Sequence, residues 1–300
     1  MPHHAMPPAR ERAALAAVLA RSRALLIDVD GVLVQAERPI PGAAAALATL
    51  ARRGLPYRLA TNTSLVSRAT LARQASALGL AIDPGAIVSA LSVTAETTAR
   101  RFPGQPLYVL CSDDARTEFA GQHLLDEATA EAAADGAMSG SSQRPAERCA
   151  AVVIGDAPAS LDYEHLDRAF RLVRSGARLI AMHRNPWWLT PRGPSLDAGA
   201  FVVGLEFATR RRAIVAGKPA AVFFAAALRA LGHAAPDVAM IGDDVRTDVA
   251  GARRAGMMAV WVRSGRHGSA DLALHAAGGG RTPDAVADDL AAIVAALPEA

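Results

Sequence analysis

The sequence is poor in cysteine, asparagine, lysine and aromatic residues. The shortage of cysteine excludes some classes of protein, and the shortage of aromatic residues limits how the cores can be built. Only two cysteines, Cys111 and Cys149, occur among 300 residues. Two are too few for a disulfide framework, and their spacing is not that of metal ligands. Both stand in apolar runs, so we expect them to be small core residues. Because aromatic residues make up only 4% of the chain, its cores must be built mainly from Ala, Leu and Val.

Long hydrophobic runs and basic stripes are also missing. No apolar stretch approaches the length of a membrane span. The net charge is only +3, and no basic stripe with interleaved aromatics suggests nucleic-acid binding. An apolar run at 13–20 follows Arg10-Glu11-Arg12 and faintly resembles a signal peptide, but an amphipathic helix is the better interpretation. We therefore expect a cytoplasmic protein that binds neither nucleic acid nor membranes.

Strand-like and helix-like segments alternate along both ends of the chain. This alternation predicts an α/β fold with a mostly parallel, Rossmann-like sheet. The expected strands are 24–28, 57–60, 87–90, 213–216, 238–241 and 258–262. The expected helices are 42–53, 64–78, 219–231, 247–255 and a terminal helix within 283–297.

A second alternating block lies between these two ends. Its expected strands are 107–110, 150–154 and 178–182, and its expected helix is 163–174. We interpret it as a second α/β domain, covering 92–204, that is inserted into a core domain made of 1–91 and 205–300. The stretch 127–147 is rich in Ala, Gly, Ser and acidic residues, which favours a mobile loop or a frayed helix.

Two aspartates, Asp28 and Asp30, directly follow the first apolar strand. Carboxylates at the end of a buried strand are costly without a partner, and strand alternation points both the same way. A cation would offset their repulsion, and one acid would serve as nucleophile while the other exchanges protons. A solvated polar turn is the alternative, at about even odds when the pair is considered alone.

Two further polar groups follow other expected strands. Thr61 and Asn62 end one strand and open a helix, where hydroxyl and free N–H groups bind phosphate, although an ordinary N-cap has the same composition. Asp243, Asp244 and Asp248 follow the strand at 238–241 and suit a hard cation such as Mg²⁺. An acidic first helical turn is the alternative for this second group.

Lys218 is the only lysine among 32 lysine and arginine residues. An ammonium group is a compact point charge, unlike the planar guanidinium fork, so a tight anionic site would require lysine at this position. Chance survival of one surface lysine is the alternative. Since parallel sheets bind ligands at the carboxyl ends of their strands, we expect all four features to lie at one sheet edge.

Taken together, these motifs resemble those of the haloacid dehalogenase superfamily of phosphohydrolases. The matching residues are Asp28-x-Asp30-Gly31, Thr61-Asn62, Lys218, and Gly242-Asp243-Asp244 with Asp248. The inserted block resembles the α/β (C2-type) cap of subfamily IIA. Within that subfamily, the chain is most similar to the branch of phospholysine phosphohistidine inorganic pyrophosphate phosphatase and related haloacid dehalogenase-like hydrolase domain-containing proteins.

The resemblance implies a Mg²⁺-dependent phosphatase that acts on a small phosphorylated molecule. Asp28 would form an aspartyl-phosphate, and Asp30 would act as the acid and then the base. Thr61, Asn62 and Lys218 would bind phosphate. The metal ligands would be Asp28, Asp30 and Asp243, with Asp248 and Asp244 farther out. Subfamily IIA caps also imply a homodimer formed through the cap.

Two positions depart from the family pattern, and several alternatives stay open. Animal members of the branch commonly have Ser where this chain has Asp30, and many subfamily members have a second Asn where this chain has Thr63. A non-catalytic phosphate-binding protein is the main alternative function. The substrate range is open, and pyrophosphate and phospho-amino acids are included in it. Candidate specificity residues in the cap are Asp156, Tyr163, His183, Asn185, Trp187 and Trp188.

Overall fold

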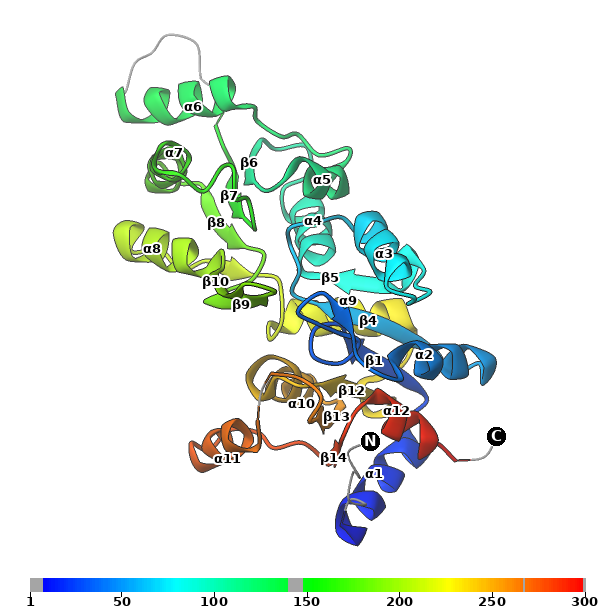
Figure 1. Cartoon of the computed structure of the whole chain (residues 1–300). Coiled ribbons are helices and arrows are strands. Elements are labelled where there is room, and N and C mark those ends of the chain that lie inside the picture. The colour runs from blue at the N-terminus through cyan, green and yellow to red at the C-terminus, as the bar shows by residue number, and fades with distance from the viewer. Residues whose placement is uncertain (1–7, 140–147, 267, 299–300) are drawn as a thin grey trace. The chain divides into compact units, whose positions relative to one another are not determined.

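The computed structural model describes residues 8–139, 148–266 and 268–298, which form two compact units (Figure 1). Unit 1 comprises Ala72–Val88 and the described residues of Met1–Thr61 and Lys218–Ala300, and unit 2 comprises Asn62–Leu71 and Ser89–Gly217. The domain limits expected from the sequence stay a prediction; they differ from the units in assigning 62–71, 89–91 and 205–217 to the core.

Unit 1 contains a six-stranded sheet in the order β14-β13-β12-β1-β4-β5. The strands are β1 (Ala24–Asp28), β4 (Tyr57–Thr61), β5 (Ile87–Ser89), β12 (Val238–Gly242), β13 (Met258–Val262) and β14 (Ala285–Ala287). Strand β1 is fully buried and pairs in parallel with β12 and β4. Parallel strands covered on both faces appear as continuous hydrophobic runs, which explains the sequence Ala-Leu-Leu-Ile before Asp28.

Helices pack around this sheet. They are α1 (Ala9–Arg21), α2 (Ala43–Arg52), α9 (Ala221–Leu231), α10 (Ala250–Arg254), α11 (Ser269–Ala277) and α12 (Leu290–Ala295). Helix α9 packs on β4 and α10, α2 packs on α12, and α1 packs on β14. Short elements complete unit 1: the hairpin β2 (Val34–Gln35) and β3 (Arg38–Pro39), the 3₁₀ turns η1 (Pro84–Ala86) and η3 (Ala235–Asp237), and the π turn η4 (Val245–Val249). Helix α3 (Arg68–Ala77) begins in unit 2 and ends in unit 1.

Unit 2 is built on a four-stranded parallel sheet in the order β11-β8-β7-β6. The strands are β6 (Leu107–Leu110), β7 (Ala151–Ile154), β8 (Arg178–Ala181) and β11 (Ile214–Val215). Alternate residues of each strand face opposite sides, and two hydrophobic clusters result. One contains Tyr108 and Leu110 and the other contains Leu107 and Val109.

Helices of unit 2 cover these two faces. They are α4 (Ala90–Arg101), α5 (Asp113–Arg116), α6 (Glu127–Ser139), α7 (Tyr163–Arg174) and α8 (Gly199–Thr209), with the 3₁₀ turn η2 (Thr117–Phe119). Residues of α6, α7 and α8 belong to the first cluster, and residues of α4 and α5 to the second. An antiparallel hairpin, β9 (Trp187–Thr190) and β10 (Gly193–Leu196), follows β8.

The structure confirms the α/β class and most of the expected strands, but the strand at 213–216 was assigned wrongly to the core sheet. It is observed as β11 and pairs with β8, Ile214 opposite Ile180. The strand joins the sheet of unit 2 because its side chains point alternately to the two faces of that sheet. Ile214 packs against one hydrophobic cluster of unit 2 and Val215 against the other. A two-residue strand gives too short a pattern to show which sheet it joins.

Helix boundaries also differ from the expectation. The helix expected at 64–78 begins only at Arg68, and the helix expected at 247–255 is split into η4 and α10. Part of the stretch 127–147 is the regular helix α6, while 140–147 lie outside the described residues. Helix α6 is held because Ala130 and Ala134 are buried and Glu131 pairs with the buried Arg168 at 2.5 Å.

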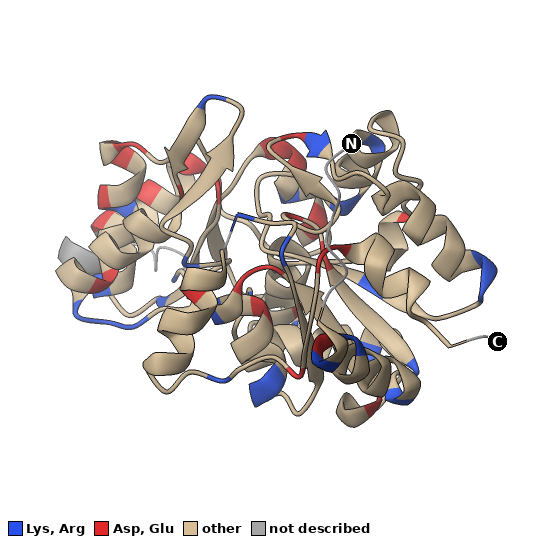
Figure 2. Cartoon of the chain, turned by 60° about the horizontal axis from the view of Figure 1, so that its bottom comes forward, with Lys and Arg blue, Asp and Glu red and all other residues tan. Residues whose placement is uncertain are grey.

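Charged residues of both signs are interspersed over the described parts of both units (Figure 2). Among the described residues, no helix combines the length and the apolar character needed to cross a membrane.

We expect Leu59→Ala to lower the free energy of unfolding by about 2–5 kcal/mol, since Leu59 is fully buried in β4 and truncation leaves a cavity. Urea denaturation followed by circular dichroism measures this loss. Leu274→Ala is the matched control: Leu274 is 68% exposed, so its loss should stay within roughly 0.5 kcal/mol. Equal losses for the two variants would contradict the packing described for the sheet.

Candidate active site

Strand register brings three of the four polar features to one edge of the unit 1 sheet. Asp28 is the last residue of β1 and lies opposite Ala60, so the neighbouring strand β4 ends one residue later at Thr61. On the other side Ile27 lies opposite Ile241, and β12 ends just before Asp243. The structure therefore places Asp28, Thr61 and Asp243 at the carboxyl end of adjacent strands, where open parallel sheets bind ligands.

Lys218 reaches the same edge by a different route. It does not follow a strand of the core sheet, as the sequence suggested, but comes shortly after β11 of unit 2. Its buried Nζ lies 2.7 Å from Asp28 Oδ1 and 2.8 Å from Asp248 Oδ1. Burial alone would lower the pKa of Lys218, but Asp248 and Asp28 together raise it above its usual value. The ammonium therefore keeps its charge and bridges two carboxylates.

Asp28 is buried, and both of its hydrogen bonds fall on one oxygen. Lys218 Nζ and the Val29 N–H each donate to Oδ1, at 2.7 and 2.8 Å. Burial raises the pKa of this carboxyl to about 6, against the opposing effect of Lys218 and with further increases from Asp243 and Asp30. This arrangement fixes Oδ1 and leaves Oδ2 available to a ligand.

Asp28, Asp243 and Asp248 form a compact group of carboxylates. One oxygen of each lies within 4.8 Å of the others, and all three side chains are buried. Burial and then mutual repulsion raise the pKa of Asp243 to about 7 and that of Asp248 well above its usual value. Three crowded oxygen donors, whose repulsion Lys218 offsets only in part, fit a hard divalent cation such as Mg²⁺.

Glycines allow the acidic group to pack this closely. A Cβ on Gly265 would overlap Asp243 Oδ2, and one on Gly31 would lie 2.5 Å from Asp243 Cγ. Gly31 also has φ +82°, a conformation that other residues adopt only with strain. The Asp243 carboxylate is further held by the Arg266 N–H at 3.0 Å, and its carbonyl by Trp261 Nε1 at 2.6 Å.

Asp30 lies at the exposed mouth of this site. Its side chain is open to solvent, whereas Asp28 and Asp243 are buried. Protein atoms around the Asp30 carboxyl displace water from it, and this desolvation raises its pKa. The charges of Lys218 and Arg266 and a hydrogen bond from the Thr61 hydroxyl oppose the rise. Its position at the mouth is suitable for exchanging protons with a leaving group and with water.

Asp244 and Asp248, which the resemblance places farther out from the metal, have different surroundings in the structure. Asp244 Oδ1 accepts the N–H groups of Arg246 at 2.8 Å and Thr247 at 3.3 Å, so it caps the turn η4. Asp248 is fully buried, contacts Lys218 and accepts the Asp244 N–H at 3.1 Å. The helix-capping alternative therefore applies to Asp244 and not to Asp248.

The cap candidates divide into two groups within unit 2. Asp156, His183 and Asn185 come together, since His183 Nε2 lies 3.1 Å from Asp156 Oδ2 and Asn185 N–H lies 3.3 Å from His183 Nδ1. Asn62 joins them through a 3.2 Å bond from its Nδ2 to Asn185 Oδ1. The more exposed candidates are Tyr163 at the start of α7 and Trp187 and Trp188 on the hairpin.

Comparison with known proteins assigns the chain to a family. A family model described as haloacid dehalogenase-like hydrolase matches residues 25–124, and a second, HAD-hydrolase-like model matches 215–293. Haloacid dehalogenase-like hydrolase domain-containing protein 2 of Mus musculus is 34% identical over 249 residues, which cover 83% of this chain and 87% of that protein. The chain is a haloacid dehalogenase-like hydrolase.

Other proteins similar to this hydrolase support its assignment to subfamily IIA. Phospholysine phosphohistidine inorganic pyrophosphate phosphatase of Homo sapiens is 32% identical and matches 84% of this chain and 87% of its own length. A 4-nitrophenylphosphatase from Thermotoga maritima has a TM-score of 0.80 at 26% identity, covering 94% and 99% of the two chains. A glycerol phosphate phosphatase from Mycobacterium tuberculosis, solved with calcium, has a TM-score of 0.77 at 25% identity, covering 92% and 76%.

Sequence reasoning missed three polar residues of this hydrolase. Arg266 donates to Asp243 and affects Asp30, but one arginine among many gives no signal in the sequence. Ser64 and Asp197 are buried beside Asp156 and His183. Ser64 ends the polar run 61–64 that the sequence offers as a phosphate-binding feature, but its pairing with Asp156 is not predicted. Asp197 follows a hairpin that the sequence does not predict.

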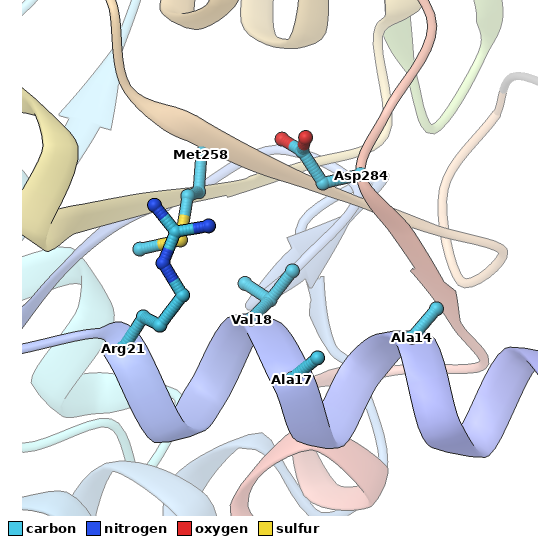
Figure 3. Close-up of a pocket in the computed structure, with 6 residues that line it drawn as sticks. All are labelled: Ala14, Ala17, Val18, Arg21, Met258 and Asp284. Carbon is cyan, nitrogen blue, oxygen red and sulfur yellow. The ribbon is translucent and has the colours of Figure 1, made fainter.

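A small pocket of about 220 Å³ in the same hydrolase lies away from these residues (Figure 3). It lies beside α1 and is lined by Ala14, Ala17, Val18, Arg21, Met258 and Asp284. The Asp284 carboxylate already accepts the Ala259 N–H at 2.8 Å and Arg253 Nη1 at 3.0 Å. Because none of its lining residues belongs to the polar motifs at the carboxyl edge of the sheet, this pocket is no candidate for the reaction.

We expect Asp243→Asn to become more stable relative to the wild type as the pH rises from about 4 to about 7 in cation-free buffer. Asp243 has a pKa of about 7 in the folded chain against an ordinary value of 3.8, so in this range it holds a proton only when folded. Stability therefore falls with rising pH in the wild type. Thermal denaturation across this range measures the difference, and Asp113→Asn at an exposed site should show no such trend. A constant difference for Asp243→Asn would contradict the repulsion described here.

Proposed function

We propose that this chain is a Mg²⁺-dependent phosphatase that hydrolyses small phosphorylated metabolites through an aspartyl-phosphate on Asp28. The observation that carries the proposal is the buried Asp28 carboxylate, held on Oδ1 by Lys218 and placed beside Asp243 and Asp248. The names of the relatives support phosphate ester hydrolysis, and one of them also includes phospholysine, phosphohistidine and pyrophosphate. We extend the candidate substrates to pyrophosphate and phospho-amino acids on that basis.

The chain's own side chains account for the two half-reactions. Asp28 Oδ2 attacks phosphorus, and the bond to the leaving oxygen breaks as Asp30 gives that oxygen a proton. Asp30 then takes a proton from water, which attacks the phosphorus of the aspartyl-phosphate and releases phosphate. Lys218, Thr61 and Asn62 bind the non-bridging oxygens.

A divalent cation would be held by the Asp28 carboxylate, the Asp30 carbonyl and Asp243, with Asp248 and Asp244 in outer positions. When bound, Mg²⁺ supplies positive charge that favours the approach of an anionic nucleophile to an anionic phosphoryl group. Lys218 supplies the fixed positive charge of the chain itself, and it stays charged because two carboxylates surround it. The neighbouring Arg266 N–H holds Asp243 in its orientation.

We also propose that the chain forms a homodimer through unit 2. A homodimer through unit 2 is supported by helix α8, whose exposed residues are apolar while its polar residues Glu206 and Thr209 are buried. Phe207 is 87% exposed and Val203 47% exposed on this helix. A helix with apolar residues on its open face gains stability from a second surface that covers them.

Phosphate release from p-nitrophenyl phosphate tests the proposed function. We expect activity with Mg²⁺, loss of activity with EDTA, and a loss of more than about 10³-fold in kcat for Asp28→Asn, because the nucleophile is removed. Asp113→Asn, at an exposed site of unit 2, is the control and should keep wild-type activity. Phosphate binding without EDTA-sensitive turnover would instead support the non-catalytic phosphate-binding alternative.

The acid role of Asp30 predicts a dependence on the leaving group. Asp30→Asn should lower kcat about 10²–10⁴-fold for glycerol phosphate, whose alkoxide leaves poorly without a proton. The loss for p-nitrophenyl phosphate should be much smaller, because p-nitrophenolate leaves without one. Steady-state kinetics on both esters gives the two ratios, and equal losses would show that Asp30 does not protonate the leaving oxygen.

A further inference from the structure

A buried polar cluster in unit 2 lies at the carboxyl edge of its four-stranded sheet. Asp156 follows β7, and His183 and Asn185 follow β8. This edge is where parallel sheets normally bind ligands, but here residues 62–64 of the same chain occupy it. We propose that Asn185, together with His183 and Asp156, positions Asn62 for phosphate binding instead of contacting the substrate. The proposal rests on the proposed function, in which Asn62 is a phosphate ligand.

The first anchor of this segment is Ser64, which is fully buried. Its hydroxyl donates to Asp156 Oδ2 at 2.7 Å and accepts the Asp156 N–H at 2.9 Å. His183 Nε2 lies 3.1 Å from the same hydroxyl and 3.1 Å from the same carboxylate oxygen. Reciprocal bonds among buried groups specify one geometry, because any displacement leaves a polar atom unpaired.

The proton positions in this cluster favour hydrogen bonds over a metal ion. Asp156, His183 and Asp197 have donor atoms within 4.8 Å of one another, which is a plausible metal set by composition. However, His183 Nδ1 accepts the Asn185 N–H at 3.3 Å, so the ring proton is on Nε2 and points to Asp156. To ligate a metal through Nε2, the nitrogen that faces Asp156 and Asp197, His183 would need the opposite arrangement, with Nε2 bare and Nδ1 donating.

Charges within the cluster agree with this assignment. Burial alone would raise the pKa of Asp156, but hydrogen bonds from His183, Asp197 and Ser64 lower it below its usual value. Burial and the hydrogen bond with Asp156 raise the pKa of Asp197 to about 7. Asp156 is therefore the anion that accepts three hydrogen bonds, and Asp197 carries the shared proton.

The second anchor is Asn62 itself. Its Nδ2 donates to Asn185 Oδ1 at 3.2 Å. Its Oδ1 lies against Gly217, since a Cβ on that glycine would be 2.7 Å away. The Gly217 N–H in turn donates to Met182 O at 2.7 Å. The Asn62 carboxamide is therefore held on two sides.

The positions of Asn62 and Gly217 matter because each is next in the sequence to an expected phosphate ligand. Asn62 is bonded to Thr61, and Gly217 is bonded to Lys218, so both held residues are covalent neighbours of expected phosphate ligands. Asn62 and Asn185 are also the only two asparagines in the sequence. A side-chain amide provides both a donor and an acceptor, and here the Nδ2 donor of Asn62 binds the Oδ1 acceptor of Asn185.

Kinetics of Asn185 variants test the positioning role. Asn185→Ala removes the acceptor for Asn62, so we expect KM for p-nitrophenyl phosphate and the inhibition constant of inorganic phosphate to rise together, roughly 3- to 10-fold, with a smaller change in kcat. Asn185→Asp keeps an accepting oxygen and should restore near wild-type values. Arg192→Ala, on the exposed turn between β9 and β10, is the control.

A double-mutant cycle separates positioning from direct substrate contact. If Asn185 acts through Asn62, then Asn62→Ala with Asn185→Ala should be no worse than Asn62→Ala alone. Additive losses in the double variant, or an unchanged KM in Asn185→Ala, would overturn the proposal.

A readout without catalysis keeps this test distinct from that of the proposed function. Selective ¹⁵N-asparagine labelling gives only two side-chain amide groups in NMR spectra, because the chain has two asparagines. In Asn185→Ala the remaining Asn62 amide should shift and exchange its protons faster with water. An unchanged Asn62 signal would overturn the positioning role even in an active enzyme, and a wild type without phosphatase activity would refute only the proposed function.

Discussion

The structure of the candidate site depends on one ammonium group placed between two buried carboxylates. Lys218 contacts Asp28 at 2.7 Å and Asp248 at 2.8 Å, and all three side chains are almost fully buried. Removing one member of such a group would leave an uncompensated buried charge, which costs several kcal/mol. Asp243 remains in excess of the available positive charge. The group therefore carries excess negative charge, which a bound cation would offset.

Two expected phosphate ligands, Thr61 and Lys218, stand in the sequence at points where the chain passes from one unit to the other. Thr61 is the last residue before the chain first enters unit 2, and Lys218 is the first residue after the chain leaves unit 2 for the last time. The polar cluster around Ser64, His183 and Asn185 holds the neighbours of both residues. If the proposed function holds, the residues next to these two ligands are therefore held by side chains of unit 2.

Sequence reasoning worked best where one short pattern contained all the information. The apolar run before Asp28 predicted a buried strand and a carboxylate at its end, and the register of β1 with β4 and β12 explains why the motifs meet. It failed where long-range pairing decides, as for β11, which joins β8 and not the core sheet. Asp244 and Asp248 have the same local composition, and only burial shows which one caps a turn and which one faces Lys218. Ser64 and Asp197 gave no local sign of their role, because their partners lie far away in the sequence.

The presence of only one lysine also limits how the chain reacts with acylating reagents. Its ε-amine is buried and positively charged between Asp28 and Asp248, so it is neither accessible nor nucleophilic in the folded state. No other side chain can form an amide with an acylating reagent such as acetyl phosphate. Lysine acylation in this protein is therefore confined to molecules in which the surroundings of Lys218 have opened, and its rate would report directly on how often that happens.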